Sequence, residues 1–120
     1  MEETHPEPAE KPKLAAEIIE KDLLNPPSLK ALAGMVGCTA HQLTRSFQNV
    51  VGKTIPEFVR DKRIDWATQL LESSDENVGQ ISSTVGYASL SAFSRAFVRR
   101  HGVPPHTYRL SRQSLLEKQN

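Results

Sequence analysis

Apolar residues recur three and four positions apart along most of the chain, which is the spacing of an amphipathic helix. They predict helices over residues 14–23, 29–36, 40–51, 55–72, 78–85 and 90–101, with a last turn or two around 108–110. No alternating run rich in β-branched residues lies between turn signals. We therefore expect an all-α fold of about seven helices.

Residues with known preferences for helix ends support these boundaries. Thr39 is followed three positions later by Gln42, which is the capping-box arrangement at the start of a helix, and Thr54 with Glu57 repeats it. Asn25-Pro26-Pro27 ends the first predicted helix, because proline lacks the N–H donor that a helix needs. Four other predicted helices are each followed by a glycine, a residue suited to a left-handed helix end; these are Gly37, Gly52, Gly86 and Gly102.

The chain contains an internal repeat with an offset of 49 positions before its turn and 50 after it. The matched residues are Val36-Gly37 with Val85-Gly86, Leu43 with Phe93, Arg45 with Arg95, Phe47 with Phe97, and Gly52 with Gly102. Each copy is a short helix, a turn that contains glycine and a second helix, which is a helix-turn-helix unit. The alternative is two hairpins of a helical bundle that match by coincidence.

The helix predicted between the two copies has a length that suits DNA. Its roughly 18 residues rise about 27 Å, and with its flanks this approaches the ~34 Å between successive major grooves on one face of DNA. Two helix-turn-helix subdomains, at about 13–53 and 75–110, would thus be joined by a long connecting helix at about 55–73. The whole domain would span 13–112, between an acidic, proline-rich linker or tail at 1–12 and a C-terminal tail at 113–120.

The net charge of +1 conceals an uneven distribution. Residues 1–27 hold three lysines against seven acids, a net of −4, and residues 28–120 hold twelve basic residues against seven acids, a net of +5. No acid occurs from Asn77 to Leu116, where five arginines do. A surface of one sign attracts polyanions such as nucleic acid, although many charge runs are only solvated faces.

Several function classes find no support in the residues. No apolar run approaches the roughly 18 residues of a membrane span, so we expect a cytoplasmic protein with no membrane partner. The single cysteine, Cys38, has no disulfide partner, and with His41 it lacks a second ligand pair for zinc. The serines cluster at helix starts, where capping explains them. We expect no metal, no cofactor and no catalytic residues, so the protein is not an enzyme.

Three motifs in the second copy are more specific: Val85-Gly86-Tyr87, Phe93-Ser94-Arg95-Ala96-Phe97, and the stretch from Gly102 to Arg109. They resemble the DNA-binding domain of the AraC/XylS family of bacterial transcription regulators, and the likeness extends from about Leu14 to Arg109. The resemblance implies a sequence-specific regulator of double-stranded promoter DNA, an activator that contacts RNA polymerase. The chain departs from the family at Gln48 and Asn49, where basic residues are usual, which implies weaker phosphate contacts in the first copy.

Family members usually carry an effector-binding or dimerisation domain ahead of this one, although some consist of this domain alone. The acidic segment at 1–12 resembles an interdomain linker, which favours a fragment of a longer regulator.

The predicted DNA contacts lie on the second helix of each copy. With Leu43 and Phe47 inward, the outward residues of the first copy are His41, Thr44, Arg45 and Gln48. The resemblance places His41, Thr44 and Arg45 toward base edges and Thr39, Ala40 and Gln48 nearer the DNA backbone. In the second copy the predicted contacts are Ser89, Ser91, Ala92, Ser94 and Arg95, with Arg99, Arg100 and His101 extending the basic surface. Leu90 offers only an apolar contact, such as one to a thymine methyl.

Each of these assignments has an alternative. Arg45 and Arg95 could pair with acids of the connecting helix, such as Asp61 or Asp65, and His41 could simply be solvated. Arg109 is better explained as closing the last helix than as touching a base. The alternative function for the whole chain is a helical protein-interaction module without DNA affinity.

Overall fold

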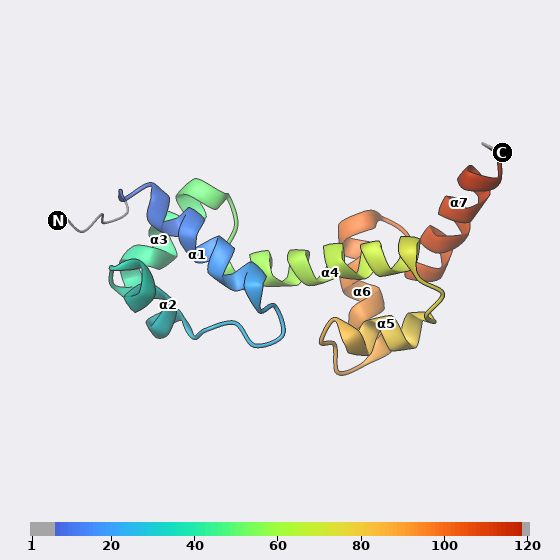
Figure 1. The fold of residues 1–120 in the computed structure, drawn as a ribbon, viewed down its shortest axis with the longest axis horizontal. Helices are drawn as coiled ribbons and strands as arrows, with labels where there is room; N and C mark the ends of the chain where they lie inside the picture. The colour runs from blue at the N-terminus through green and yellow to red at the C-terminus, as the bar shows by residue number, and fades with distance from the viewer. Residues whose placement is uncertain (1–6, 119–120) are drawn as a thin grey trace. The chain divides into compact units, whose positions relative to one another are not determined.

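The computed structural model of the chain describes residues 7–118. Within that range it contains seven α-helices and no strand, so the expectation of an all-α fold is confirmed (Figure 1). The helices are α1 (Glu10–Lys21), α2 (Leu29–Val36), α3 (Ala40–Val51), α4 (Ile55–Ser73), α5 (Val78–Thr84), α6 (Leu90–His101) and α7 (Pro105–Lys118).

The predicted helix ends follow from the caps that the sequence contains. Thr39 and Gln42 form both hydrogen bonds of a capping box at the start of α3, and Ser89 Oγ accepts from the Ala92 N–H at the start of α6. Gly52 and Gly102 then end these helices with φ of +84° and +80°, a left-handed backbone that favours glycine. α3 and α6 consequently have the same length of 12 residues and matched ends.

The two terminal helices are longer than expected. α1 begins at Glu10, inside the segment predicted to be a linker, and Pro12 lies in its first turn, where a missing N–H does no harm. The Lys11 ammonium also donates to the carbonyl of Gly37, at the end of α2, over 2.9 Å. α7 extends to Lys118, so most of the predicted C-terminal tail is helical. The rest of the predicted linker, residues 1–6, lies outside the described residues.

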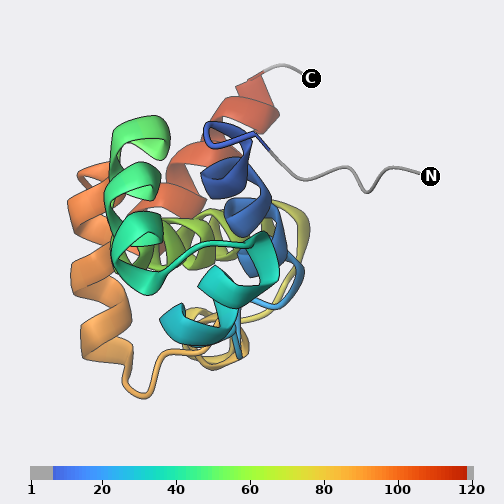
Figure 2. The same cartoon turned by 90° about the vertical axis from the view of Figure 1, so that its left-hand side faces the viewer.

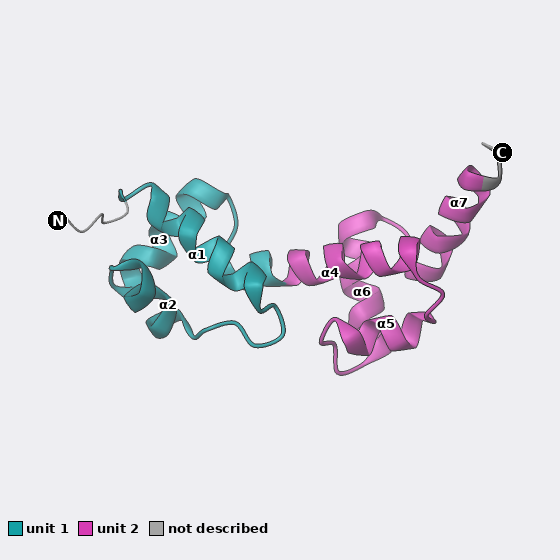
Figure 3. Ribbon diagram, viewed as in Figure 1, with its two compact units in different colours: residues 1–59 teal, residues 60–120 magenta. Residues whose placement is uncertain are grey.

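The chain divides into two compact units, with the boundary after Val59 in the second turn of α4 (Figure 3). In unit 1, α1 packs against both α2 and α3 (Figures 1 and 2). The buried core of unit 1 includes Ile19, Leu32, Leu43, Phe47 and Phe58. The rings of Phe47 and Phe58 meet edge to face, with their centroids 5.4 Å apart.

Unit 2 has its own core, in which the C-terminal part of α4 packs with α5 and α6. Its buried residues are Ile64, Ala67, Leu71, Ile81, Val85, Phe93 and Phe97. Phe93 and Phe97 correspond to Leu43 and Phe47 in the repeat, and all four are fully buried. α3 and α6 therefore each pack against their own unit through one face, and the opposite face remains available for contacts outside the unit.

Candidate nucleic-acid interface

The outer face of α3 carries the polar residues that the sequence predicted there. His41, Thr44, Arg45 and Gln48 are all exposed. Within residues 7–118 the Arg45 side chain forms no ion pair or hydrogen bond, so the alternative in which it pairs with an acid of α4 is not supported. The Thr44 hydroxyl donates to the carbonyl of Ala40 over 3.0 Å, which leaves its oxygen lone pairs as acceptors.

The residues just before this face serve mainly to start the helix. The Thr39 hydroxyl accepts from the Gln42 N–H at 3.1 Å, and the Gln42 side chain accepts from the Thr39 N–H at 3.0 Å. Ala40 is half-buried. Thr39 and Ala40 thus lie at the N-terminal end of α3, where backbone N–H groups favour anions such as phosphate, and their predicted contacts to the DNA backbone stay predictions.

The outer face of α6 is similar but has an additional cation. Ser91, Arg95 and Arg99 are exposed, whereas Ala92 and Ser94 are half-buried. Neither Arg95 nor Arg99 forms an ion pair or side-chain hydrogen bond among the described residues. Arg95 lies at the position of Arg45 in the repeat, so each unit presents one unpaired arginine at the same place.

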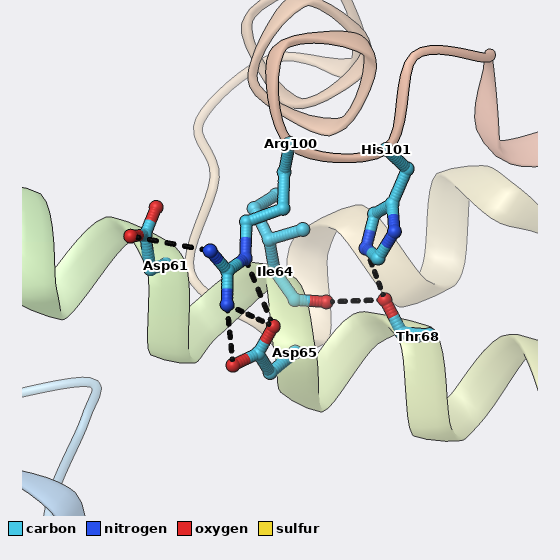
Figure 4. Close-up of polar contacts among 6 residues, drawn as sticks. All are labelled: Asp61, Ile64, Asp65, Thr68, Arg100 and His101. Atoms are coloured by element: carbon cyan, nitrogen blue, oxygen red, sulfur yellow. Dashed lines mark hydrogen bonds and ion pairs between the residues drawn. The ribbon is translucent and has the colours of Figure 1, made fainter.

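Arg100 is held differently from its neighbours. Its Nε and Nη2 donate to the two carboxylate oxygens of Asp65, both at 3.1 Å, and its Nη1 lies 3.4 Å from an oxygen of Asp61 (Figure 4). The hydrogen bond to Asp65 raises the pKa of Arg100 above its ordinary value. The two acids of α4 that were considered as partners for Arg45 and Arg95 are therefore engaged with Arg100, whose charge they neutralise.

His101 also faces α4 (Figure 4). Its Nε2 lies 2.9 Å from the Thr68 hydroxyl, which is also 2.9 Å from the carbonyl of Ile64, so the three groups form one hydrogen-bonded chain. The imidazole ring packs on Phe97, with centroids 4.5 Å apart, and on Tyr108, at 5.3 Å. His101 is half-buried and helps to hold α6 against α4. The sequence had instead suggested that it extends the basic surface.

Two arginines of α7 bind the C-terminal end of α4 and the segment after it. Arg109 donates to three backbone carbonyls, those of Leu71 and Ser74 at 3.1 Å and that of Glu76 at 2.6 Å, so its contacts are structural and join α7 to α4. Arg112 lies 3.3 Å from a carboxylate oxygen of Glu72, which also accepts from the Tyr108 hydroxyl at 2.6 Å. That hydrogen bond raises the pKa of Tyr108.

These contacts reduce the basic surface that the sequence suggested. Of the five arginines between Asn77 and Leu116, three are engaged by acids or carbonyls at α4. Arg95 and Arg99 remain as the two without such partners among the described residues. Sequence reasoning missed the engagement of Arg100 because its two acids lie 35 and 39 positions away, and no local spacing signals such a pair.

Other kinds of site receive no support from the part of the chain that the structure describes. No group of three or more His, Cys, Asp or Glu side chains there could hold a metal ion, and Cys38 is a half-buried free thiol. Over the same residues, no helix has the length and apolar character needed to cross a lipid bilayer.

Comparisons with known proteins agree with this geometry. Residues 32–111 match a family of helix-turn-helix domains. A solved transcriptional regulator with an AraC-type DNA-binding domain, from Chromobacterium violaceum, has the same fold with a TM-score of 0.78 at 26% identity, and the match covers 85% of this chain and 91% of that one. The chain belongs to the AraC-type family of helix-turn-helix transcription regulators. The resemblance found in the sequence is therefore confirmed.

Two relatives show how this AraC-type domain compares in length. The chain is 34% identical to the HTH-type transcriptional regulator AlkR of Acinetobacter baylyi over 84 residues, which are 70% of this chain and 28% of AlkR. It is 28% identical to the multiple antibiotic resistance protein MarA of Escherichia coli over 93 residues, 78% of this chain and 73% of MarA. The chain thus spans less than a third of AlkR and most of MarA.

A further structural neighbour supports the fold. The DNA-binding domain of the global transcriptional factor AdpA, solved in complex with a target DNA, matches with a TM-score of 0.75 at 22% identity, over 87% of this chain and 94% of that one. AlkR, the Chromobacterium violaceum protein and AdpA are transcription regulators by name.

Proposed function

We propose that this chain is the DNA-binding part of a transcription activator and that α3 and α6 read two successive major grooves of one asymmetric promoter site. The observation that supports this proposal is the matched pair of outer faces. Each has an unpaired, exposed arginine, Arg45 or Arg95, backed by a buried apolar stripe. Arginine suits base readout because its planar fork can donate to guanine O6 and N7 together.

The other predicted contacts divide by chemistry. His41 and Thr44 on α3, and Ser91 and Ser94 on α6, offer groups that can hydrogen-bond to base edges. Thr39, Ala40, Gln48, Ser89, Ala92 and Arg99 are proposed contacts to the DNA backbone. We assign Arg100 to holding α6 on α4, because two carboxylates already neutralise its charge.

The test is selection of binding sites from random duplex by the purified chain, repeated with Arg45→Ala and Arg95→Ala. We expect a non-palindromic site of nearly two turns, in which each substitution relaxes a different block and weakens binding by about 1–3 kcal/mol. Lys13→Ala, on the exposed surface of α1, is the matched control and should leave the selected site unchanged. Binding that is absent, or that does not respond to salt, would reject a DNA-binding function and favour the protein-interaction module.

Activation requires RNA polymerase as a second partner, and it is tested separately. Transcription in vitro from a template that carries the selected site should rise when the chain is added. A fall in transcript at the same occupancy of the site would instead identify a repressor.

A further inference from the structure

Two apolar side chains lie on the surface of α6 and are not part of the apolar core of unit 2. Leu90 is 51% exposed and Val98 is 41% exposed, and neither belongs to the apolar cluster of unit 2. Leu90, Ser94 and Val98 are spaced at i, i+4 and i+8, so they form one row along the helix. Val98 is also three residues after Arg95, which brings this row beside the proposed base-reading arginine.

The matched row of α3 has a different character. Counting back fifty positions gives Ala40, Thr44 and Gln48, of which only the small, half-buried Ala40 is apolar. The repeat therefore conserves the arginine in both units but places larger apolar groups beside it in unit 2 alone. Single exposed apolar residues are common on protein surfaces, but a pair in one row of a recognition helix suggests a shared contact.

The major groove offers one apolar group for such a row, the C5-methyl group of thymine. We infer that Leu90 and Val98 recognise thymine methyl groups, so that unit 2 selects thymine beside the base read by Arg95. Unit 1 lacks this selection, because its matching residues Ala40 and Gln48 are proposed contacts to the DNA backbone. The inference rests on the proposed function, since it requires α6 to enter the groove. Eight residues of helix span about 12 Å, or roughly three to four base pairs, which sets the spacing of the two thymines.

The inference is tested by replacing each thymine of the selected duplex, one at a time, with deoxyuridine, which removes the methyl group and keeps the base pairing. We expect two positions, three or four base pairs apart, at which the affinity of the unchanged chain falls about four-fold, the value for one buried methyl-sized group. Leu90→Ala should weaken binding to the thymine duplex by a similar factor and should abolish the effect of deoxyuridine at one position. Val98→Ala should abolish it at the other.

Matched controls exist for both substitutions. Leu110 on α7 is 52% exposed and Val50 on α3 is 41% exposed, and both lie away from the row. Leu110→Ala and Val50→Ala should leave affinity and the deoxyuridine response unchanged, and circular dichroism should show that all four variants remain folded.

Three outcomes would overturn the inference. Specific binding that is insensitive to deoxyuridine at every position would overturn it while leaving the proposed function intact. A deoxyuridine response that persists in both Leu90→Ala and Val98→Ala would assign the methyl contact to other residues. Absence of specific duplex binding would overturn both the inference and the proposed function.

Discussion

α3 and α6 are equivalent in the internal repeat, but their last turns are held by different chemistry. At the end of α3, Val51 packs partly buried against the core of unit 1, and Val50 is exposed. Fifty positions later, Arg100 and His101 bind the carboxylates and the Thr68 hydroxyl of α4 instead (Figure 4). The same structural unit can thus be closed by apolar or by polar contacts, and an arginine in this turn is not evidence of a DNA contact.

The two units also differ less in available positive charge than their sequences suggest. The sequence places its acid-free, arginine-rich stretch in the second copy, which suggests that unit 2 supplies most of the attraction to DNA. Once the partners at α4 are assigned, the two recognition helices differ by one unpaired cation, Arg99 where α3 has Asn49. The specificity of the two units should therefore differ more than their phosphate affinity does.

The largest expected effect concerns Arg109, which has no polar counterpart in unit 1, where the matching residue is Val59. Arg109→Ala removes three hydrogen bonds from a charged donor to backbone carbonyls, so the free energy of unfolding should fall by about 2–4 kcal/mol. Urea denaturation measures this loss, and amide hydrogen exchange should place it in unit 2.

The control for this prediction is Arg112→Ala. Its ion pair with Glu72 is exposed, so we expect a loss of less than about 1 kcal/mol. Equal losses in the two variants, or faster exchange confined to unit 1, would contradict the role assigned to Arg109.

A smaller effect should distinguish two adjacent arginines on α6. Arg99→Ala should weaken binding to all DNA sequences alike and lower the salt slope by about 1, because it removes one phosphate contact. Arg100→Ala should leave the salt slope unchanged, since Asp61 and Asp65 already neutralise that charge. Titrations of the selected duplex at several salt concentrations measure both slopes, and equal slopes for the two variants would show that Arg100 reaches the DNA.

The smallest expected effect concerns Tyr87, which occupies the place of Cys38 in the repeat. Its hydroxyl is buried without a hydrogen-bond partner among the described residues, and burial raises the pKa of the phenol. Tyr87→Phe removes this unsatisfied group and keeps the edge contact to Phe93, so stability should be unchanged or rise by up to about 1 kcal/mol. Thermal denaturation of this variant and of the unchanged chain measures the difference in stability. Tyr108→Phe, which loses the hydrogen bond to Glu72, should instead be less stable than the unchanged chain.

Much of the fold could be predicted because its signals are local. The capping box of Thr39 and Gln42, the left-handed glycines and the buried stripe of Leu43 and Phe47 each depend on residues within a few positions of one another. The internal repeat then predicts two units and a connecting helix, whose predicted span of 55–73 agrees with α4. The outward positions of His41 and Arg45 follow from the same periodicity.

The sequence by itself therefore determined the helices, their inner and outer faces and the family of this chain. The tertiary structure alone decided which charges are available. Several arginines and several acids have compatible chemistry, and the choice among them depends on which side chains the packing of α6 and α7 brings against α4. Asp65 meets Arg100 and not Arg95 because Arg100 lies on the flank of α6 that faces α4, whereas Arg95 points away from the core.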